Sequence, residues 1–320
     1  MKIIGTGSAL PKKVVTNDML SDFLETNDEW ISTRTGIKTR HIITDERFEE
    51  LAADAAGRAI DAAGLCPEDI DYIVCSNVSN LYITPHLSSI IMGSLGIKGP
   101  HCPTMDVNVA CVGFVQALDV CDALLATGRA HNILLVAVEE CTRFCDWSDR
   151  NCAVLFGDGA GAVVLTKGDS LVSCKLTTTP MPDVIVYRNP MEPTPFEMRE
   201  GIDSHSALVM KGREVFRMAV TSASRDIAEV VADAGMTLDD IDHFLLHQAN
   251  LRINEAIRET LHQPEEKFPT NVQRFGNTSS ASIPLLLDEG VREGRIKHGD
   301  TLLLSAFGAG FVTGTAIIKY

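Results

Sequence analysis

AADAAGRAIDAAGLCPEDID, residues 52–71, recurs without gaps 171 positions later as ASRDIAEVVADAGMTLDDID, residues 223–242. Each copy has the periodicity of an alanine-rich amphipathic helix, a glycine that ends it (Gly64 and Gly235), an acidic turn and then an apolar strand. The strands that follow are YIVCSNV and HFLLHQA. The repeat predicts a chain built from two related α/β halves.

A second pair of similar segments lies at the end of each half. NILLVAVEE followed by GDGAGAVVLTK resembles DTLLLSAFGAG followed by FVTGTAIIK, an apolar run that meets a glycine-rich turn and a further strand. Short strands that alternate with helices indicate βαβ units and mostly parallel sheets. We therefore expect two pseudo-twofold-related halves, residues 1–170 and 171–320, packed as one unit.

Composition and charge narrow the class of protein. The 320 residues are 45% hydrophobic and 22% charged, and 28 Lys and Arg face 43 Asp and Glu, for a net charge of −15. This acidic balance argues against non-specific nucleic-acid binding, so an acidic partner must be held by a local cluster of Arg and Lys. No apolar stretch reaches the roughly 18 residues of a membrane span, and the N-terminus lacks a signal-peptide core, so we expect a cytoplasmic protein.

The nine cysteines, from Cys66 to Cys174, include no CxxC pair. An odd number in a chain without a signal peptide indicates reduced thiols. Cys141 and Cys145 stand four apart, but no second pair of ligands lies nearby, so packing is favoured over a metal site. We expect no metal.

Cys111 lies in DVNVACVGFVQAL, residues 106–118, where a strand-like run meets a predicted helix. If CVGFVQALDVCDALLATG is that helix, Cys111 is in its first turn and Gly128 is its C-terminal stop. The unpaired N–H groups and positive dipole end of a helix N-terminus lower the pKa of a thiol and favour the reactive thiolate. Cysteine is also among the most buried residue types, so an inert packing cysteine is the alternative.

Two other apolar runs are followed by polar side chains. In paired α/β halves, the loops at the carboxyl ends of the strands can converge on one site. His247 begins HQANLRI, where a buried structural histidine is the alternative, and Asn277 lies in FGNTSSASIP, where a turn or helix cap is the alternative. The runs FGDGAGAVVL and AFGAGFVTG fit neither phosphate-loop pattern, so we interpret them as turns whose N–H groups form an oxyanion hole. Together these parts suit acyl chemistry on thioesters, with His247 as a hydrogen-bond donor rather than a base.

The chain resembles the β-ketoacyl-acyl-carrier-protein (ACP) synthase III family, the initiating condensing enzymes of fatty-acid synthesis, in the thiolase superfamily. The resemblance runs nearly end to end, through TNDEWISTRTGIKTRH, DVNVACVGFVQAL, DWSDRNCAVLFGDGAGAVVL, HQANLRI, GNTSSASIP and AFGAGF. It implies a duplicated thiolase-like α/β fold layered as αβαβα. It also implies a homodimer without a cofactor, which transfers an acyl group from acyl-CoA to a cysteine and condenses it with malonyl-ACP.

The resemblance also implies roles for individual residues. The catalytic triad is Cys111, His247 and Asn277, and the oxyanion hole uses the N–H groups of Cys111 and Ala309, with Phe307 shielding the cysteine. The residues that contact CoA and pantetheine are Trp30, Arg34, Arg150, Asn250 and Arg252. The residues that attract the carrier protein are Arg213, Arg217 and Arg252, and those at the acyl pocket are Thr84, from the partner subunit, and Val112.

Several departures from the family pattern concern the acyl and carrier sites. Val112 and Thr313 replace a small residue and a tryptophan, and residues 180–210 lack a glycine-rich segment. Thr84 stands where a phenylalanine would restrict primers, so longer or branched acyl groups are expected. Glu259 and Thr260 replace lysines that meet the carrier, which indicates weaker docking or a different carrier.

Three hypotheses therefore stand. The first is a primer-condensing synthase. The second is a relative in secondary metabolism that passes the acyl group to an amine, a hydroxyl or another carbon nucleophile. The third is a non-catalytic partner subunit, which has no need of an intact triad and CoA site.

Overall fold

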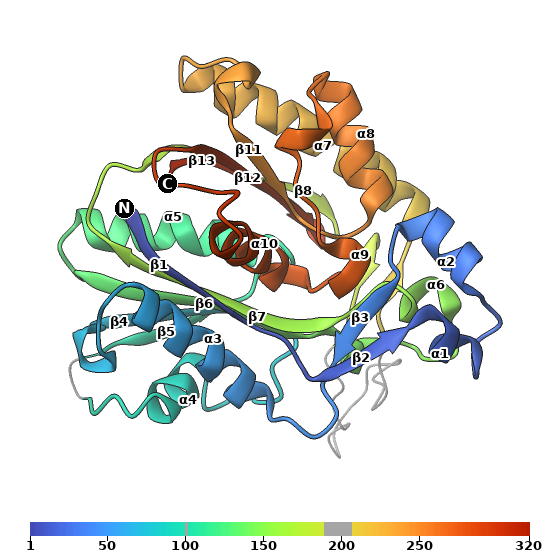
Figure 1. Ribbon diagram of the computed structural model, residues 1–320, viewed down its shortest axis with the longest axis horizontal. Coiled ribbons are helices and arrows are strands. Elements are labelled where there is room, and N and C mark those ends of the chain that lie inside the picture. Colours follow the sequence, from blue (N-terminus) through green and yellow to red (C-terminus); the bar gives the residue numbers. More distant parts are fainter. Residues whose placement is uncertain (100–101, 189–206) are drawn as a thin grey trace, which may run out of the picture.

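The computed structural model describes residues 1–99, 102–188 and 207–320, and it is layered αβαβα (Figure 1). The first sheet has the order β1 (Lys2–Ala9), β7 (Asp158–Thr166), β6 (Asn132–Glu140), β4 (Tyr72–Ser76), β5 (Thr104–Val107). The second has the order β11 (His243–Leu246), β12 (Thr301–Gly308), β13 (Gly310–Lys319), β8 (Leu171–Met181). The predicted α/β layering is confirmed.

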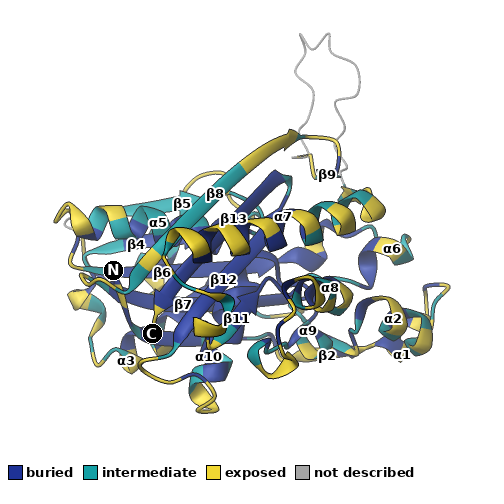
Figure 2. Cartoon of the chain, turned by 90° about the horizontal axis from the view of Figure 1, so that it is seen from above, coloured by how far each residue is buried: buried dark blue, intermediate teal, exposed yellow. Residues whose placement is uncertain are grey.

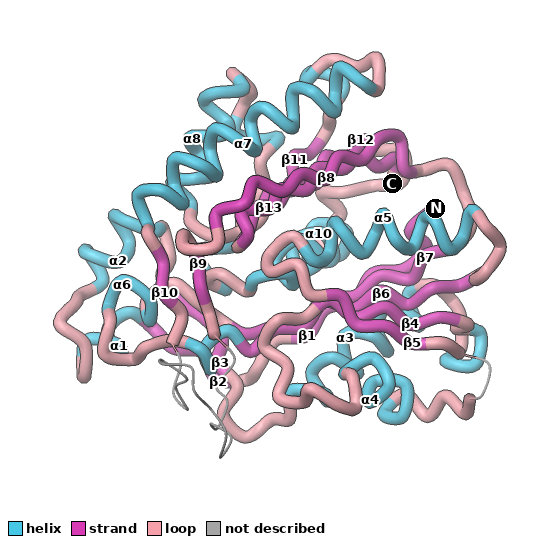
Figure 3. The backbone as a smooth tube through the Cα atoms, turned by 180° about the vertical axis from the view of Figure 1, so that it is seen from behind, coloured by secondary structure: helices cyan, strands magenta, loops and turns pink. Residues whose placement is uncertain are grey.

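Helices form the other three layers. Between the sheets lie α5 (Gly113–Ala126) and α10 (Ser282–Arg292). The first sheet is covered by α3 (Phe48–Ala62) and α4 (Leu87–Ser94), and the second by α7 (Gly212–Asp233) and α8 (Leu251–Leu261), as Figure 3 shows from behind. The shorter elements are α1 (Asn17–Ser21), α2 (Asp28–Thr35), α6 (Arg150–Ala153), α9 (Val272–Phe275), β2 (Lys13–Thr16), β3 (Thr39–Ile42), β9 (Ile185–Val186) and β10 (Val209–Met210).

The sequence repeat is a structural repeat. Gly64 and Gly235 have φ of 69° and 68°, the left-handed conformation that ends a helix and that glycine adopts without strain. After each, an aspartate accepts a hydrogen bond from a backbone N–H three residues earlier, Asp69 from Cys66 at 2.8 Å and Asp240 from Thr237 at 2.7 Å. The strand that follows, β4 or β11, then pairs in parallel with β6 or β12.

The sheets are mixed, and the prediction of mostly parallel sheets is wrong. β12 pairs antiparallel with β13 because a single residue, Ala309, turns the chain straight back, whereas β6 pairs antiparallel with β7 across the longer connection 141–157, which contains α6. β1 and β8 add antiparallel to β7 and β13. Strand–helix alternation along the sequence did not reveal these antiparallel pairs.

The core lies between the sheets, where α5 is buried on several faces (Figure 2). A helix that is apolar around most of its circumference packs in the interior rather than on the surface. The first glycine-rich run serves this packing: a Cβ on Gly161 of β7 would lie 2.8 Å from the Cβ of Pro284 in α10. Its prediction as an oxyanion-hole turn is therefore wrong.

Two general features concern the nine cysteines and the helices. All nine are free thiols, and among the described residues no group of three or more His, Cys, Asp or Glu could hold a metal ion. No helix in the described ranges is long and apolar enough to cross a membrane.

Candidate active site

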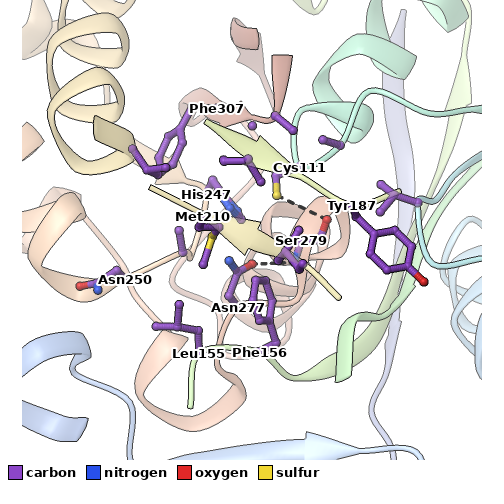
Figure 4. Close-up of a pocket in the computed structure, with 18 of the residues that line it drawn as sticks. Cys111, Leu155, Phe156, Tyr187, Met210, His247, Asn250, Asn277, Ser279 and Phe307 are labelled. Carbon is purple, nitrogen blue, oxygen red and sulfur yellow. Dashed lines mark hydrogen bonds between the residues drawn. The ribbon is translucent and has the colours of Figure 1, made fainter. Parts of the chain in front are cut away.

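A cavity of about 420 Å³ brings together Cys111, His247 and Asn277, which lie far apart in the sequence (Figure 4). Cys111 precedes α5, His247 follows β11, and Asn277 follows α9. The cavity therefore combines residues of both sequence repeats. The remaining lining is mostly apolar and aromatic, including Phe144, Leu155, Phe156, Tyr187, Leu208, Met210 and Phe307.

The sequence predicts Cys111 in the first turn of α5, but the structure places it just before that helix. The helix begins at Gly113, and Val112 is its N-cap. Ala110 has φ of 47°, a left-handed conformation that turns the chain sharply between β5 and α5. Burial raises the pKa of the Cys111 thiol to about 12, and the charge of Glu139 adds to this, while a hydrogen bond from Ser279 opposes it.

His247 is buried and held from several sides. Its backbone N–H donates to the carbonyl of Ser305 at 2.8 Å, which continues the register of β11 on β12. Its Nδ1 lies 2.7 Å from Oγ of Ser282, and its ring meets that of Phe307 edge-on at 5.3 Å. Burial lowers the pKa of His247 to about 3, so the imidazole is neutral at physiological pH.

Asn277 is fixed through its backbone and its side-chain oxygen. Its N–H donates to the carbonyl of Leu155 at 2.8 Å, and its own carbonyl accepts from the N–H of Gly157 at 3.1 Å. Its Oδ1 accepts from the N–H of Ser279 at 2.8 Å, the dashed contact in Figure 4. Because Oδ1 is occupied, the Nδ2 donor is the group left for the cavity.

The second glycine-rich run, predicted as an oxyanion-hole turn, borders the cavity. Phe307, Gly308 and Ala309 line the cavity at the end of β12. A Cβ on Gly308 would lie 3.0 Å from the backbone nitrogen of Cys111, so glycine allows the two backbones to approach closely. The ring of Phe307 stacks on that of Phe311 at 6.1 Å.

Two arginines lie over the ring of Trp30. The guanidinium carbons of Arg34 and Arg150 are 4.5 Å and 4.8 Å from the centroid of its ring. Trp30 stands in the first turn of α2, where Asn27 caps its backbone N–H at 2.7 Å. Arg150 also donates to the carbonyl of Glu25 at 2.6 Å. The three predicted CoA-contacting side chains are thus in one cluster.

The mouth of the cavity carries the other predicted arginines. Arg252 lies with its guanidinium 6.0 Å from the ring of Phe216, which lines the cavity, and Arg213 and Arg217 are exposed on either side of Phe216 in α7. Asn250 caps α8, accepting from the N–H of Arg252 at 3.0 Å. Its Nδ2 donates to the carbonyl of Arg34 at 3.1 Å, which ties the mouth to the Trp30 cluster.

The residues predicted at the acyl pocket are placed differently. Val112 is fully buried and does not line the cavity, because its side chain packs where a Cβ of Gly314 would be, 2.7 Å away. Val112 is therefore a core residue, and its prediction as a pocket residue is corrected. Thr84 is exposed and does not line the cavity of its own chain. Thr313 is buried and donates a hydrogen bond to Asp226 of α7.

Most of the segment 180–210 lies outside the described residues. Its two ends pair as β9 and β10, and Ile185, Val186, Tyr187, Leu208 and Met210 line the cavity. Tyr187 packs on Phe144 at 5.2 Å between ring centroids, and Phe144 meets Phe156 edge-on at 5.8 Å. Sequence reasoning missed this aromatic wall, and it also missed Ser279, Ser282 and Glu139, which hold the predicted triad.

Known proteins match this arrangement over its full length. The family model for 3-oxoacyl-[acyl-carrier-protein (ACP)] synthase III matches residues 105–180, and the model for the C-terminal part of the same enzymes matches residues 231–320. The chain belongs to the β-ketoacyl-ACP synthase III family. The predicted family is thereby confirmed, and its members are condensing acyltransferases.

Individual relatives support the same assignment. A β-ketoacyl-ACP synthase III of Xanthomonas euvesicatoria is 44% identical over 324 residues, which span 100% of this chain and 98% of the relative. The crystal structure of 3-oxoacyl-ACP synthase III from Aquifex aeolicus superimposes with a TM-score of 0.92 at 37% identity, covering 100% and 99% of the two chains. The priming β-ketosynthase of the R1128 polyketide pathway gives a TM-score of 0.92 at 33% identity over 99% and 95%. The fold is therefore the thiolase-like fold of the synthase III enzymes.

Proposed function

We propose that this protein condenses an acyl-CoA primer with malonyl-ACP to give β-ketoacyl-ACP, through an acyl group on Cys111. The observation that carries the proposal is the convergence of Cys111, His247 and Asn277 on one cavity, at whose mouth Asn250 links to the Trp30 cluster. A thiol, two hydrogen-bond donors and an apolar chamber are the groups that thioester condensation needs.

In the first half-reaction the Cys111 thiolate attacks the thioester carbonyl. The developing oxyanion accepts hydrogen bonds from the N–H groups of Cys111 and Ala309, two residues that line the cavity where Gly308 approaches the nitrogen of Cys111 closely. The C–S bond to CoA breaks, and CoA leaves as a thiol with the proton that Cys111 gave up. Trp30, Arg34 and Arg150 hold the nucleotide end of CoA by stacking and by charge.

In the second half-reaction malonyl-ACP loses CO2, and the resulting enolate oxygen accepts hydrogen bonds from His247 and Asn277. Oγ of Ser282 accepts from the N–H of Gln248 at 3.3 Å and lies 2.7 Å from Nδ1 of His247, to which we assign the hydroxyl as the hydrogen-bond donor. That places the imidazole proton on Nε2, as a donor to the enolate. The carbanion then attacks the acyl carbonyl and frees Cys111. The reaction needs no metal or cofactor, because the thioester activates the acyl group and decarboxylation supplies the carbanion.

The exposed arginines at the mouth suit an acidic carrier. Arg213, Arg217 and Arg252 surround Phe216 on a protein whose net charge is −15, so this patch attracts a negatively charged partner that the rest of the surface repels.

We also propose that the protein works as a homodimer. Leu81 and Ile83, in the loop that carries Thr84, are 47% and 82% exposed, and covering such side chains is favourable. Sedimentation of the Ile83→Asp variant tests this: a shift from dimer to monomer is expected, and an unchanged dimer contradicts the placement.

Turnover tests the proposed function. Purified protein, an acyl-CoA and malonyl-ACP should yield CO2 and a carrier whose mass has changed from malonyl to β-ketoacyl. The double variant His247→Ala, Asn277→Ala should still form the acyl-enzyme but no β-ketoacyl-ACP. Acyl transfer to an amine or hydroxyl without consumption of malonyl-ACP would replace this function by the alternative in secondary metabolism, and no acyl transfer at all would favour the non-catalytic subunit.

A further inference from the structure

A serine hydroxyl contacts the sulfur of Cys111. Oγ of Ser279 lies 3.4 Å from Sγ of Cys111 with donor geometry, the second dashed contact in Figure 4. Among the described residues no other side chain donates a hydrogen bond to this sulfur, and Nδ1 of His247 is engaged with Ser282. The hydroxyl is therefore placed where a thiolate needs a donor.

The backbone of Ser279 is held in an unfavourable conformation to make this contact. Its φ is 49°, a left-handed region that costs a residue with a Cβ about 1 kcal/mol or more and that glycine adopts freely. Its N–H donates to Oδ1 of Asn277 at 2.8 Å, so the same turn fixes a triad residue and aims the hydroxyl at the sulfur. Ser279 itself is 3% exposed.

A buried carboxylate anchors the turn from below. Glu139, at the end of β6, is fully buried, and its Oε1 accepts from Oγ of Ser280 at 2.7 Å. Its Oε2 accepts from Oγ of Ser79 at 2.7 Å and from the N–H groups of Val78 and Ser79 at 3.1 Å and 3.2 Å. These four donors satisfy the carboxylate, the Ser279 side chain also interacts with it, and Glu139 thus joins the first sheet to the turn of Ser279 and Ser280.

We propose that Ser279 is a further catalytic residue, whose hydroxyl donates a hydrogen bond to Cys111 and stabilises its thiolate, and that Glu139 is the positioning residue that holds its turn. The inference rests on the proposed function for its catalytic meaning. Burial and the charge of Glu139 both raise the pKa of the Cys111 thiol, so the thiolate depends on a local donor.

The step is balanced without a further reactant. Ser279 keeps its proton throughout and only donates a hydrogen bond. The Cys111 thiol gives its proton, the S–C bond to the acyl group forms, the S–C bond to CoA breaks, and the proton ends on the CoA thiol. Within the described part of the chain, three titratable groups face the sulfur: Glu139 from β6, Cys141 from the turn that follows it, and His247.

Alkylation of Cys111 by iodoacetamide tests the inference without any CoA thioester. Rate constants are measured from pH 7 to pH 10 on the full-length protein, with peptide mapping to separate Cys111 from the exposed Cys66. Loss of a hydrogen bond to a charged group should raise the apparent pKa of Cys111 by about one unit in Ser279→Ala. The thiolate fraction falls about tenfold but each thiolate reacts about threefold faster, so alkylation below the pKa slows about threefold.

Two variants keep the test independent of folding. Ser279→Gly removes the hydroxyl and relieves the positive φ, so it should show the same shift as Ser279→Ala with equal or greater stability. Ser224→Ala is the matched control, because Ser224 is a buried serine outside the cavity lining whose hydroxyl has no partner. It should leave alkylation of Cys111 unchanged. Unchanged rates in both Ser279 variants would overturn the role of Ser279.

The role of Glu139 is tested by coupling. In a Glu139→Gln background the turn is no longer held by a carboxylate, so adding Ser279→Ala should slow alkylation of Cys111 by less than about twofold, against about threefold in the wild type. An equal slowing in both backgrounds would overturn the positioning role. Failure of Cys111 to accept an acyl group from CoA would instead overturn the proposed function, because alkylation does not depend on it.

Discussion

The buried neutral state of His247 predicts a specific dependence of stability on pH. The pKa of His247 falls from 6.5 to about 3 on folding, because burial disfavours the imidazolium. Below pH 6.5 the unfolded chain binds a proton that the folded protein does not, so this residue stabilises the fold above pH 6.5 and progressively less as the pH falls towards 3. Between pH 7.5 and pH 5.0 the loss amounts to about 2 kcal/mol.

The wild type alone does not reveal this loss, because a buried carboxyl acts in the opposite direction. Burial raises the pKa of Asp158 from 3.8 to about 7. Between those values the folded protein binds a proton that the unfolded chain does not, so acidification stabilises the fold by a similar amount. The two effects largely cancel in one protein, but the contribution of Asp158 is common to the wild type and to a His247 variant.

The assay is therefore urea unfolding of the wild type and of His247→Gln at pH 7.5 and at pH 5.0. The change to pH 5.0 should cost the wild type about 2 kcal/mol more than it costs the variant, since glutamine does not titrate. Equal changes in the two proteins would refute the buried neutral imidazole. The same assignment predicts that titration of His247 does not affect the condensation rate between pH 6 and pH 7. The pH profile of the wild type should therefore contain no step with a midpoint in that range that is missing from His247→Gln.

Three further predictions follow from the cavity and its mouth. Gly308→Ala places a methyl group 3.0 Å from the nitrogen of Cys111, so acylation should slow by about 10-fold. The control Gly57→Ala, with open space around its Cβ, should leave acylation unchanged. Equal effects of the two changes would contradict the oxyanion-hole geometry. Trp30→Ala removes two cation–π contacts and should raise KM for acyl-CoA by about 10-fold with little change in kcat, and a loss confined to kcat would contradict a CoA-binding role. Arg252→Glu should raise KM for malonyl-ACP but not for acyl-CoA, and the effect should weaken with salt; an effect independent of salt would contradict electrostatic docking.

The repeated architecture was predictable because it is a local property of the chain. The helix stops at Gly64 and Gly235 and the acidic turns after them are fixed by nearest-neighbour geometry, which the sequence carries directly. The direction of β7 and β13 was not predictable in the same way, because neither the connection 141–157 nor the glycine-rich turn at Ala309 shows from its sequence whether the next strand runs antiparallel or crosses over.

The convergence of Cys111, His247 and Asn277 on one cavity was predictable, whereas the residues that hold them in place were not. Cys111, His247 and Asn277 are unusual for their places in the sequence, but serines in a small polar loop carry no pattern that separates Ser279 and Ser282 from ordinary turn residues. Glu139 offered a signal, since a carboxylate ending an apolar strand must find partners when buried. The displacement of Cys111 from the first turn of α5 depends on the left-handed Ala110, which propensity does not foresee.

The central claim is that Cys111 carries the acyl group between the two half-reactions. The most direct test is the mass of the intact protein after mixing with short-chain and branched acyl-CoAs, beside a Cys111→Ser control. The account predicts an increase by one acyl group in the wild type, none in the control, and loss of the adduct when malonyl-ACP is added. The absence of an adduct from every acyl-CoA, or an adduct that forms equally on Cys111→Ser, would contradict it.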